Sequence, residues 1–252
     1  MEDMHFVNFR LFATGVLVVF FTWNCNKSDS TAPEEPTGSI SVNIVPYDEF
    51  GGAYSPKTGV TVTVSGGGQL VSNTTDANGD ATFTGLKYAT YKVTAQKSGF
   101  ETFSGDNYAL SSSNQAWFIS RSITQLPTVT VDSLATTVNT TFPGVSVGGK
   151  FSAATPSGKS RSYILYFGNA TVSQSVSAHQ YSSSFSAFGS TTFASGDVYA
   201  NLKSSGFTTG ATVYVTPRAA SHANGFTDAT TGRFVYTAIE TLSTIRRSFV
   251  LP

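Results

Sequence analysis

The sequence of 252 residues has one cysteine, three histidines and little charge. A single cysteine cannot form a disulfide within the chain. Charged residues make up 12% of the sequence, which is too sparse for a nucleic-acid-binding surface. The net charge is zero, but residues 1–127 hold seven Lys/Arg and eleven Asp/Glu, whereas residues 128–252 hold eight and four. We therefore expect no nucleic-acid partner, and the two halves could attract each other or face different partners.

Long hydrophobic runs are also missing. The run from Leu11 to Phe21 follows Arg10 and is too short to cross a bilayer as a permanent helix, but it suits the hydrophobic region of a signal peptide. Together with Cys25 it resembles the signal of bacterial lipoproteins. The resemblance implies a signal peptide over residues 1–24 and a lipid on Cys25 that holds the protein on a membrane. A buried helix with an incidental thiol is the alternative.

A polar, acidic and proline-bearing segment follows over residues 25–37, and it has nothing to bury. We predict that it is a tether. Its first residues, Cys-Asn-Lys-Ser-Asp, are similar to the segment after the lipidated cysteine in surface-exported lipoproteins of the Bacteroidetes. The similarity implies that the folded part is extracytoplasmic, at the outer membrane or the cell surface, and leaves open which face of the membrane it occupies.

Ser, Thr and Gly are abundant, and apolar residues alternate with them at period two. This alternation is typical of half-buried strands, and 40% hydrophobic residues can fill the cores of one large or two ordinary domains. We predict an all-β fold with two antiparallel β-sandwich domains in tandem. The first would span residues 38–126, with about seven strands of which the last covers residues 115–124. The second would span residues 127–252, because Pro127 ends the pairing of the strand before it.

The clearest pattern lies in Thr75–Phe103, with the sequence TDANGDATFTGLKYATYKVTAQKSGFETF. Its alternation predicts an antiparallel pair of strands joined by a turn at residues 85–87, and Asn78-Gly79 before them suits a positive-φ turn. The residues predicted on the inner face are Ala81, Phe83, Tyr91, Val93 and Ala95. The order of residues resembles the carboxypeptidase regulatory-like domain, a transthyretin-like sandwich of bacterial secreted and surface proteins. The resemblance covers about residues 38–125 and implies a fold and a location rather than a ligand.

The second half shows strands, one of them over residues 233–239, without a specific motif. Residues 162–167, SYILYF, are apolar on both faces, which predicts a central strand. No helical periodicity appears after residue 25. In general pattern this half resembles a fibronectin type III-like or immunoglobulin-like sandwich.

Two patterns imitate catalytic motifs. Residues 144–148 match the nucleophile elbow around Ser146, and Asp197 and His222 follow in the order that hydrolases use. An elbow needs a helix after the serine, whereas another apolar strand is predicted here. Residues 158–160 similarly imitate the end of a phosphate-binding loop without its first glycine or its helix. We therefore predict no enzyme activity from either pattern, with a hydrolase as a remote alternative.

Metal ligands are scarce. His179 and His222 have no neighbouring ligands at a suitable spacing, so we predict no cofactor and no metal site and expect both histidines in surface loops. Asp76, Asn78 and Asp80 place oxygens at alternate positions and form a weak calcium candidate, but the glycine and the distal acid of a calcium loop are absent. The same three residues shape a turn, which is the favoured hypothesis.

Aromatic rings are the remaining resource for binding. Rings in the loops of a sandwich can stack on sugar faces, although any one of them could instead belong to the core. The candidate ligand-contact rings are Tyr47, Phe50, Tyr54, Tyr181 and Phe226. We predict a non-catalytic cell-surface lipoprotein that binds glycans or other surface proteins. A fimbrial subunit that pairs through added strands is the alternative, followed by a pore-former that uses residues 172–188.

Overall fold

The computed structural model describes residues 35–169, 179–221, 225–230, 232–241 and 244–252. Residues 36–252 form one compact unit. The predicted signal peptide, Cys25 and all but the last three residues of the predicted tether lie outside the described residues, as do His222 and the start of the predicted pore-forming segment. In the part that the structure describes, no helix is both long and apolar enough to cross a membrane.

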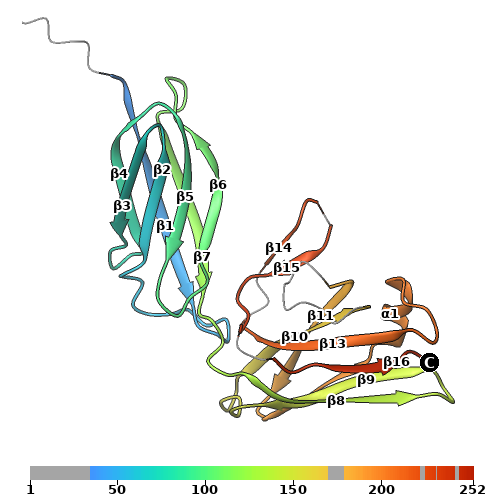
Figure 1. Ribbon diagram of the computed structural model, residues 1–252. Helices are drawn as coiled ribbons and strands as arrows, with labels where there is room; N and C mark the ends of the chain where they lie inside the picture. Colours follow the sequence, from blue (N-terminus) through green and yellow to red (C-terminus); the bar gives the residue numbers. More distant parts are fainter. Residues whose placement is uncertain (1–34, 170–178, 222–224, 231, 242–243) are drawn as a thin grey trace, which may run out of the picture. The chain divides into compact units, whose positions relative to one another are not determined.

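The fold is all-β, with two sandwiches in tandem (Figure 1). In the N-terminal sandwich, one sheet has the order β4-β1-β7 and the other the order β3-β2-β5-β6. Its seven strands match the predicted number. They are β1 (Thr37–Tyr47), β2 (Thr61–Gly66), β3 (Gln69–Thr74), β4 (Asp80–Lys87), β5 (Thr90–Gln96), β6 (Phe103–Ala109) and β7 (Ala116–Thr124).

The core of this sandwich follows from the alternation of apolar residues. Ile40, Val42 and Ile44 of β1 and Val62 and Val64 of β2 are fully buried, and the five residues predicted on the inner face of the clearest stretch are all at most 3% exposed. Burial of such side chains stabilises the fold by roughly 1.5–3 kcal/mol for each large one. The inner face could be predicted because period-two alternation fixes which side of a strand is apolar.

The predicted hairpin between residues 81–84 and 91–96 is wrong. β4 pairs with β1, whereas β5 pairs with β2 and β6, so the two strands belong to different sheets. Residues 85–87 lie inside β4 instead of forming the turn. Alternation shows which face of a strand is buried, but both sheets of a sandwich bury one face, and the pattern is therefore the same for either pairing.

One pairing is parallel. β1 runs antiparallel to β4 and parallel to β7, from Ser39↔Ala116 to Tyr47↔Thr124. The other ladders of this sandwich are antiparallel. The strand predicted over residues 115–124 is confirmed as β7, whereas β6 lies in a segment without a clear alternation and is not predicted.

The C-terminal sandwich pairs a sheet of order β11-β10-β13-β16 with one of order β12-β9-β8 (Figure 1). A short hairpin of β14 and β15 follows β13. The strands are β8 (Val131–Asn139), β9 (Gly144–Phe151), β10 (Ser160–Gly168), β11 (Tyr181–Phe188), β12 (Thr192–Asp197), β13 (Thr212–Ala220), β14 (Gly225–Thr227), β15 (Phe234–Tyr236) and β16 (Arg247–Val250).

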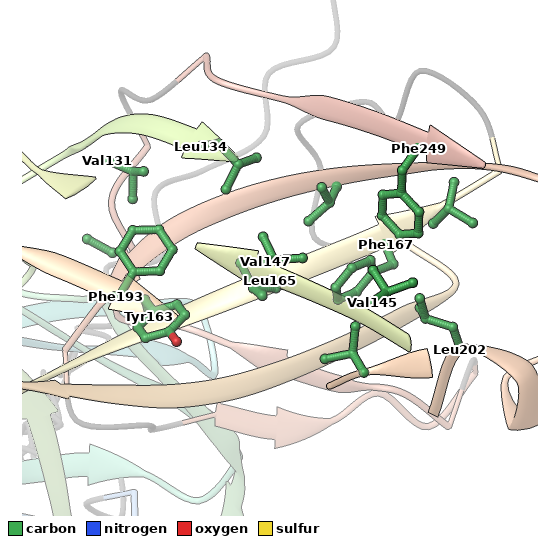
Figure 2. Close-up of a cluster of buried hydrophobic side chains, with 14 of the residues drawn as sticks. Val131, Leu134, Val145, Val147, Tyr163, Leu165, Phe167, Phe193, Leu202 and Phe249 are labelled. Atoms are coloured by element: carbon green, nitrogen blue, oxygen red, sulfur yellow. The ribbon is translucent and has the colours of Figure 1, made fainter. Parts of the chain in front are cut away.

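β10 is central, as its sequence predicts. Tyr163, Leu165 and Phe167 enter the main core, where Figure 2 shows them among apolar side chains from several strands. Ile164 and Tyr166 point to the other side of the sheet and form a smaller cluster with Ala220 and Ile239. A strand that is covered on both faces needs apolar residues at successive positions, which accounts for the run in residues 162–167.

The expectation of no helix after residue 25 is wrong at one place. α1 (Tyr199–Ser204) is a helix of six residues, and it places Leu202 in the main core. So short a helix contains too few turns to show a periodic pattern in the sequence. The strand predicted over residues 233–239 is also shorter than expected, because only residues 234–236 pair in β15.

Strand pairing is consistent with the predicted domain boundary. In the part of the chain that the structure describes, every named strand ladder joins partners on the same side of Leu126-Pro127. The predicted limits of the two domains stay predictions.

Candidate ligand-binding site

A hollow of about 700 Å³ lies along β6 and β7, and we call it the β6–β7 hollow. Its volume falls within the range of small-molecule sites, about 300–1,000 Å³. Seven of its lining residues come from the N-terminal sandwich and three from the region of β14 and β15. They are Glu101, Thr102, Phe103, Ser104, Gly105, Arg121, Ser122, Gly225, Phe226 and Thr237.

The strand order explains why this side of the N-terminal sandwich is open. β6 is the last strand of one sheet, and β7 is the last strand of the other. Side chains that point inward from an edge strand can reach solvent at the side of a sandwich, because no further strand covers them. Polar and half-buried residues can therefore occupy inward positions on β6 and β7.

Arg121 occupies such a position. It alternates with Ile119 and Ile123, which are buried, yet its own side chain is exposed. Its guanidinium lies 5.7 Å from the centroid of the Phe103 ring, donates to the Tyr108 hydroxyl at 3.2 Å and to its neighbour's carbonyl oxygen, Ser120 O, at 2.9 Å. A cation over a ring face is attracted by about 0.5–1 kcal/mol at an exposed site. The side chain is thus held at the rim of the hollow.

The aromatic residues beside Arg121 pack on one another. Tyr108 meets Trp117 in an edge-to-face contact at 5.5 Å, and the indole N–H of Trp117 donates to Ala109 O at 2.8 Å. Trp117 and Phe103 are half-buried against the core. These contacts hold the rings in place before a ligand binds. The side of the hollow formed by β6 and β7 therefore loses little conformational entropy on binding.

Glu101 is the acidic residue of the lining, and its carboxylate is engaged with the backbone. Its Oε1 accepts a hydrogen bond from Thr124 N at 2.9 Å, and the residue is 8% exposed. This hydrogen bond joins the side chain of Glu101 to Thr124, the last residue of β7.

Phe226 is the predicted ligand-contact ring that the structure places in the lining of the hollow. It lies in β14, opposite Val235 of β15, and 54% of the residue is exposed. So large an exposed ring beside a hollow offers an apolar face to a ligand.

The other candidate rings pack against protein groups. Phe50 lies under the Arg161 guanidinium at 5.0 Å, and Tyr54 meets Phe100 edge to face at 5.0 Å. Tyr181 stacks on Phe167 at 5.7 Å, and Tyr47 is half-buried at the end of β1. The structure does not bring these four rings together with Phe226.

The prediction from sequence missed Phe103 and Arg121. One signal was present: Arg121 stands at a position where the alternation of β7 requires an apolar residue. A charged residue at an inward position indicates either a buried ion pair or an edge strand.

The calcium candidate forms a turn. Asp76 Oδ1 accepts hydrogen bonds from Asn78 N at 2.8 Å and from Asp80 N at 2.9 Å, while Asn43 Nδ2 donates to Asp80 Oδ1 at 2.7 Å. Gly79 has φ +91°, as Asn78-Gly79 predicts. The backbone N–H of Asp80 lowers the pKa of Asp76 most, and those of Asn78 and Gly79 add to the effect against a smaller opposing desolvation.

The described residues contain no group of three or more Asp, Glu, His or Cys side chains arranged for a metal ion. His179, one of the two histidines considered above, is 2% exposed and contacts the Tyr166 ring at 4.9 Å. It was expected in a surface loop, and that expectation is wrong.

The elbow pattern lies within a strand. Ser146 is part of β9 and no helix follows it directly. Asp197 Oδ1 accepts hydrogen bonds from Val145 N and Tyr199 N, each at 2.9 Å, and these bonds lower its pKa. The carboxylate thus joins the end of β12 to β9 and to the first turn of α1. Residues 158–160, the other imitation, lead into β10 instead of a helix.

Two ion pairs are buried among the residues that the structure describes. Arg161 Nη1 lies 2.7 Å from Glu49 Oε2, and Thr128 donates to the same carboxylate through its N–H at 2.9 Å and its hydroxyl at 2.7 Å. Arg218 and Glu240 lie 3.8 Å apart. Buried charges are tolerated when they are paired and hydrogen-bonded, so these pairs constrain the packing around them.

The comparison with protein families gives one match. Residues 48–118 match the model of the carboxypeptidase regulatory-like domain. The predicted resemblance is confirmed over this part of the chain, which therefore carries such a domain in its N-terminal sandwich. A comparison with curated proteins gives no match.

Several solved structures are distantly similar. One is a Bacteroides uniformis protein to which carbohydrate binding is attributed (14% identity, 86% of this chain and 100% of that chain, TM-score 0.30). A DUF3823 family protein from Parabacteroides merdae shares 11% identity over 81% and 98% of the two chains, with a TM-score of 0.28. The major pilin SpaD of Corynebacterium diphtheriae shares 13% over 74% and 61%, with a TM-score of 0.30. At these TM-scores the similarities carry no argument about function.

Proposed function

We propose that this protein is a lipid-anchored, extracytoplasmic binding protein that captures glycans in the β6–β7 hollow and catalyses no reaction. The observation that supports the proposal most is the composition of this hollow. An exposed ring, Phe226, and a cation held over a second ring, Arg121 on Phe103, line the same space. Sugars present apolar C–H faces and many hydroxyl groups, which rings and polar side chains recognise together.

The other lining residues fit this chemistry. Ser104, Ser122 and Thr237 also belong to the lining, and each carries a hydroxyl group of the kind that can donate and accept a hydrogen bond. A site of a few polar groups around aromatic surface is typical of small-molecule recognition.

The membrane anchor is proposed from the sequence. The short apolar run before Cys25 supports processing as a lipoprotein, and the polar segment after it supports a tether. One acyl chain alone gives only marginal membrane binding, so stable anchoring requires more than one chain on the processed cysteine.

A glycan array probed with the full chain tests the binding function. We expect binding to at least one glycan, and a loss of at least about tenfold in affinity for Phe226→Ala and for Phe103→Ala, since stacking on a ring is worth roughly 1–3 kcal/mol. Phe142→Ala is the matched control, because Phe142 is 77% exposed and lies outside the lining of the hollow. Equal binding by all three variants would contradict the site.

One observation favours the fimbrial alternative. β3 is an edge strand whose residues Leu70 and Val71 are 76% and 38% exposed, and such an edge can accept a strand from a second copy of the chain. Polymers of the full chain that dissociate on Val71→Pro would support this alternative. A monomer at all concentrations would count against it.

A further inference from the structure

We propose that the β6–β7 hollow selects saccharides that carry a carboxylate, the uronic acids, and that Arg121 is the residue that selects them. This inference rests on the proposed glycan-binding function and adds the class of ligand. It follows from the charge, the free donors and the surroundings of one side chain.

The first step is the unused hydrogen-bonding capacity of Arg121. A guanidinium has five N–H donors, and the bonds to Ser120 O and Tyr108 Oη use one on each terminal nitrogen. Three donors therefore remain. The Phe103 ring covers one face of the guanidinium without consuming a donor, so the edge of the fork stays accessible.

The second step is the charge of the hollow. Within the described residues, Arg121 takes part in none of the ion pairs, which join Lys159 to Asp48, Arg161 to Glu49 and Arg218 to Glu240. Glu101 is the acid nearest to it in the lining, and its Oε1 is bound to the backbone of β7. The cation of the hollow is thus available to an anion from solution.

The third step is the shape of the anion. A planar fork of N–H groups matches a carboxylate through two parallel hydrogen bonds, which a point charge such as lysine cannot reproduce. A uronic acid joins such a carboxylate to a sugar ring whose C–H face can lie on Phe226. Polar residues of the lining, such as Ser104 and Ser122, lie beside Arg121 and Phe226 around the same space.

The test is a calorimetric titration of the full chain with trisaccharides of galacturonic, glucuronic and mannuronic acid. Each is compared with the neutral trisaccharide that has a hydroxymethyl group in place of the carboxylate. We expect at least one acid to bind about tenfold or more tightly than its neutral partner. Arg121→Gln should abolish this difference, because it removes the cation and its fork of donors, and Arg121→Lys should restore only part of it.

Arg246→Gln is the control, because Arg246 is exposed and lies outside the lining of the hollow. It should leave the preference unchanged. If neutral trisaccharides bind as well as the acids, and their binding still depends on Phe226, the selection by Arg121 is wrong and the glycan-binding function stands. If no glycan binds here or on the array, both proposals are wrong.

Discussion

The guanidinium of Arg121 lies 5.7 Å from the centroid of the Phe103 ring, at the side of the N-terminal sandwich where β6 and β7 end their sheets. The two residues are 18 positions apart in the sequence and belong to different sheets. Their contact joins the edges of the sandwich and turns a cation toward the β6–β7 hollow. The binding proposals depend on this relationship.

The first prediction concerns Gly79. A Cβ at this position would lie 2.3 Å from Ile44 O, and φ is +91°, so Gly79→Val adds a backbone clash to the roughly 1–3 kcal/mol of strain at positive φ. Gly85→Val is the control, since Gly85 has φ +68° but open space around it. Urea unfolding should show a larger loss of stability for Gly79→Val. Equal losses would contradict the importance of the close approach.

The second prediction concerns Asp76. Its pKa is lowered in the folded state, so it contributes stability above its unfolded value, near 3.8, and loses this contribution as the pH falls through the lower, folded value. The free energy of unfolding of the wild type should exceed that of Asp76→Asn at pH 6, and the difference should shrink below pH 3.8. A difference independent of pH would contradict this role of the carboxylate.

A chelator separates this role from the calcium alternative. If the turn of Asp76, Asn78 and Asp80 needs no metal, the melting temperature of the wild type should not change with chelator. A decrease that is absent in Asp76→Asn and Asp80→Asn would favour calcium.

The third prediction concerns the buried pair of Arg161 and Glu49. Arg161→Met leaves a buried carboxylate without its cation and should cost about 3–5 kcal/mol in unfolding free energy. The double variant Glu49→Gln with Arg161→Met should recover part of this loss. Lys159→Met is the control, because its pair with Asp48 is 3.8 Å long and the lysine side chain is 47% exposed, which predicts a cost below about 1 kcal/mol.

The fourth prediction concerns the anchor. Cys25→Ala should move the protein from the membrane fraction to the soluble fraction, because the proposed lipid on Cys25 holds it there through buried methylene groups. Fractionation after a high-salt wash measures the distribution. Retention of the variant in the membrane would contradict the lipoprotein proposal.

The sequence predicts the faces of strands better than their partners. Val60, Val62 and Val64 are buried as their alternation indicates, and the apolar run of residues 162–167 marks the central strand β10. The positive φ of Gly79 follows from the local chemistry of the turn. The assignment of β4 and β5 to different sheets could not be predicted, because pairing depends on contacts between residues that are distant in sequence.

The grouping of residues in the candidate site could not be predicted either, because it also depends on contacts between residues that are distant in sequence. Phe226 could be chosen as an exposed loop ring, but nothing in the sequence links it to Phe103 or Arg121. The tertiary arrangement alone brings these residues to one hollow. Besides Phe226, Arg121 carries a sequence signal of this site, a charge at an inward position of a strand.

Hydrogen exchange of the full chain, measured by mass spectrometry with and without a glycan found on the array, tests the central claim most directly. A ligand in the β6–β7 hollow should slow exchange in peptides that contain residues 102–105 and 121–122, and Phe226→Ala should reduce this protection. Peptides around Phe142 should not change. Protection confined to another part of the chain, with residues 102–105 and 121–122 unaffected at saturating glycan, would contradict the proposed site.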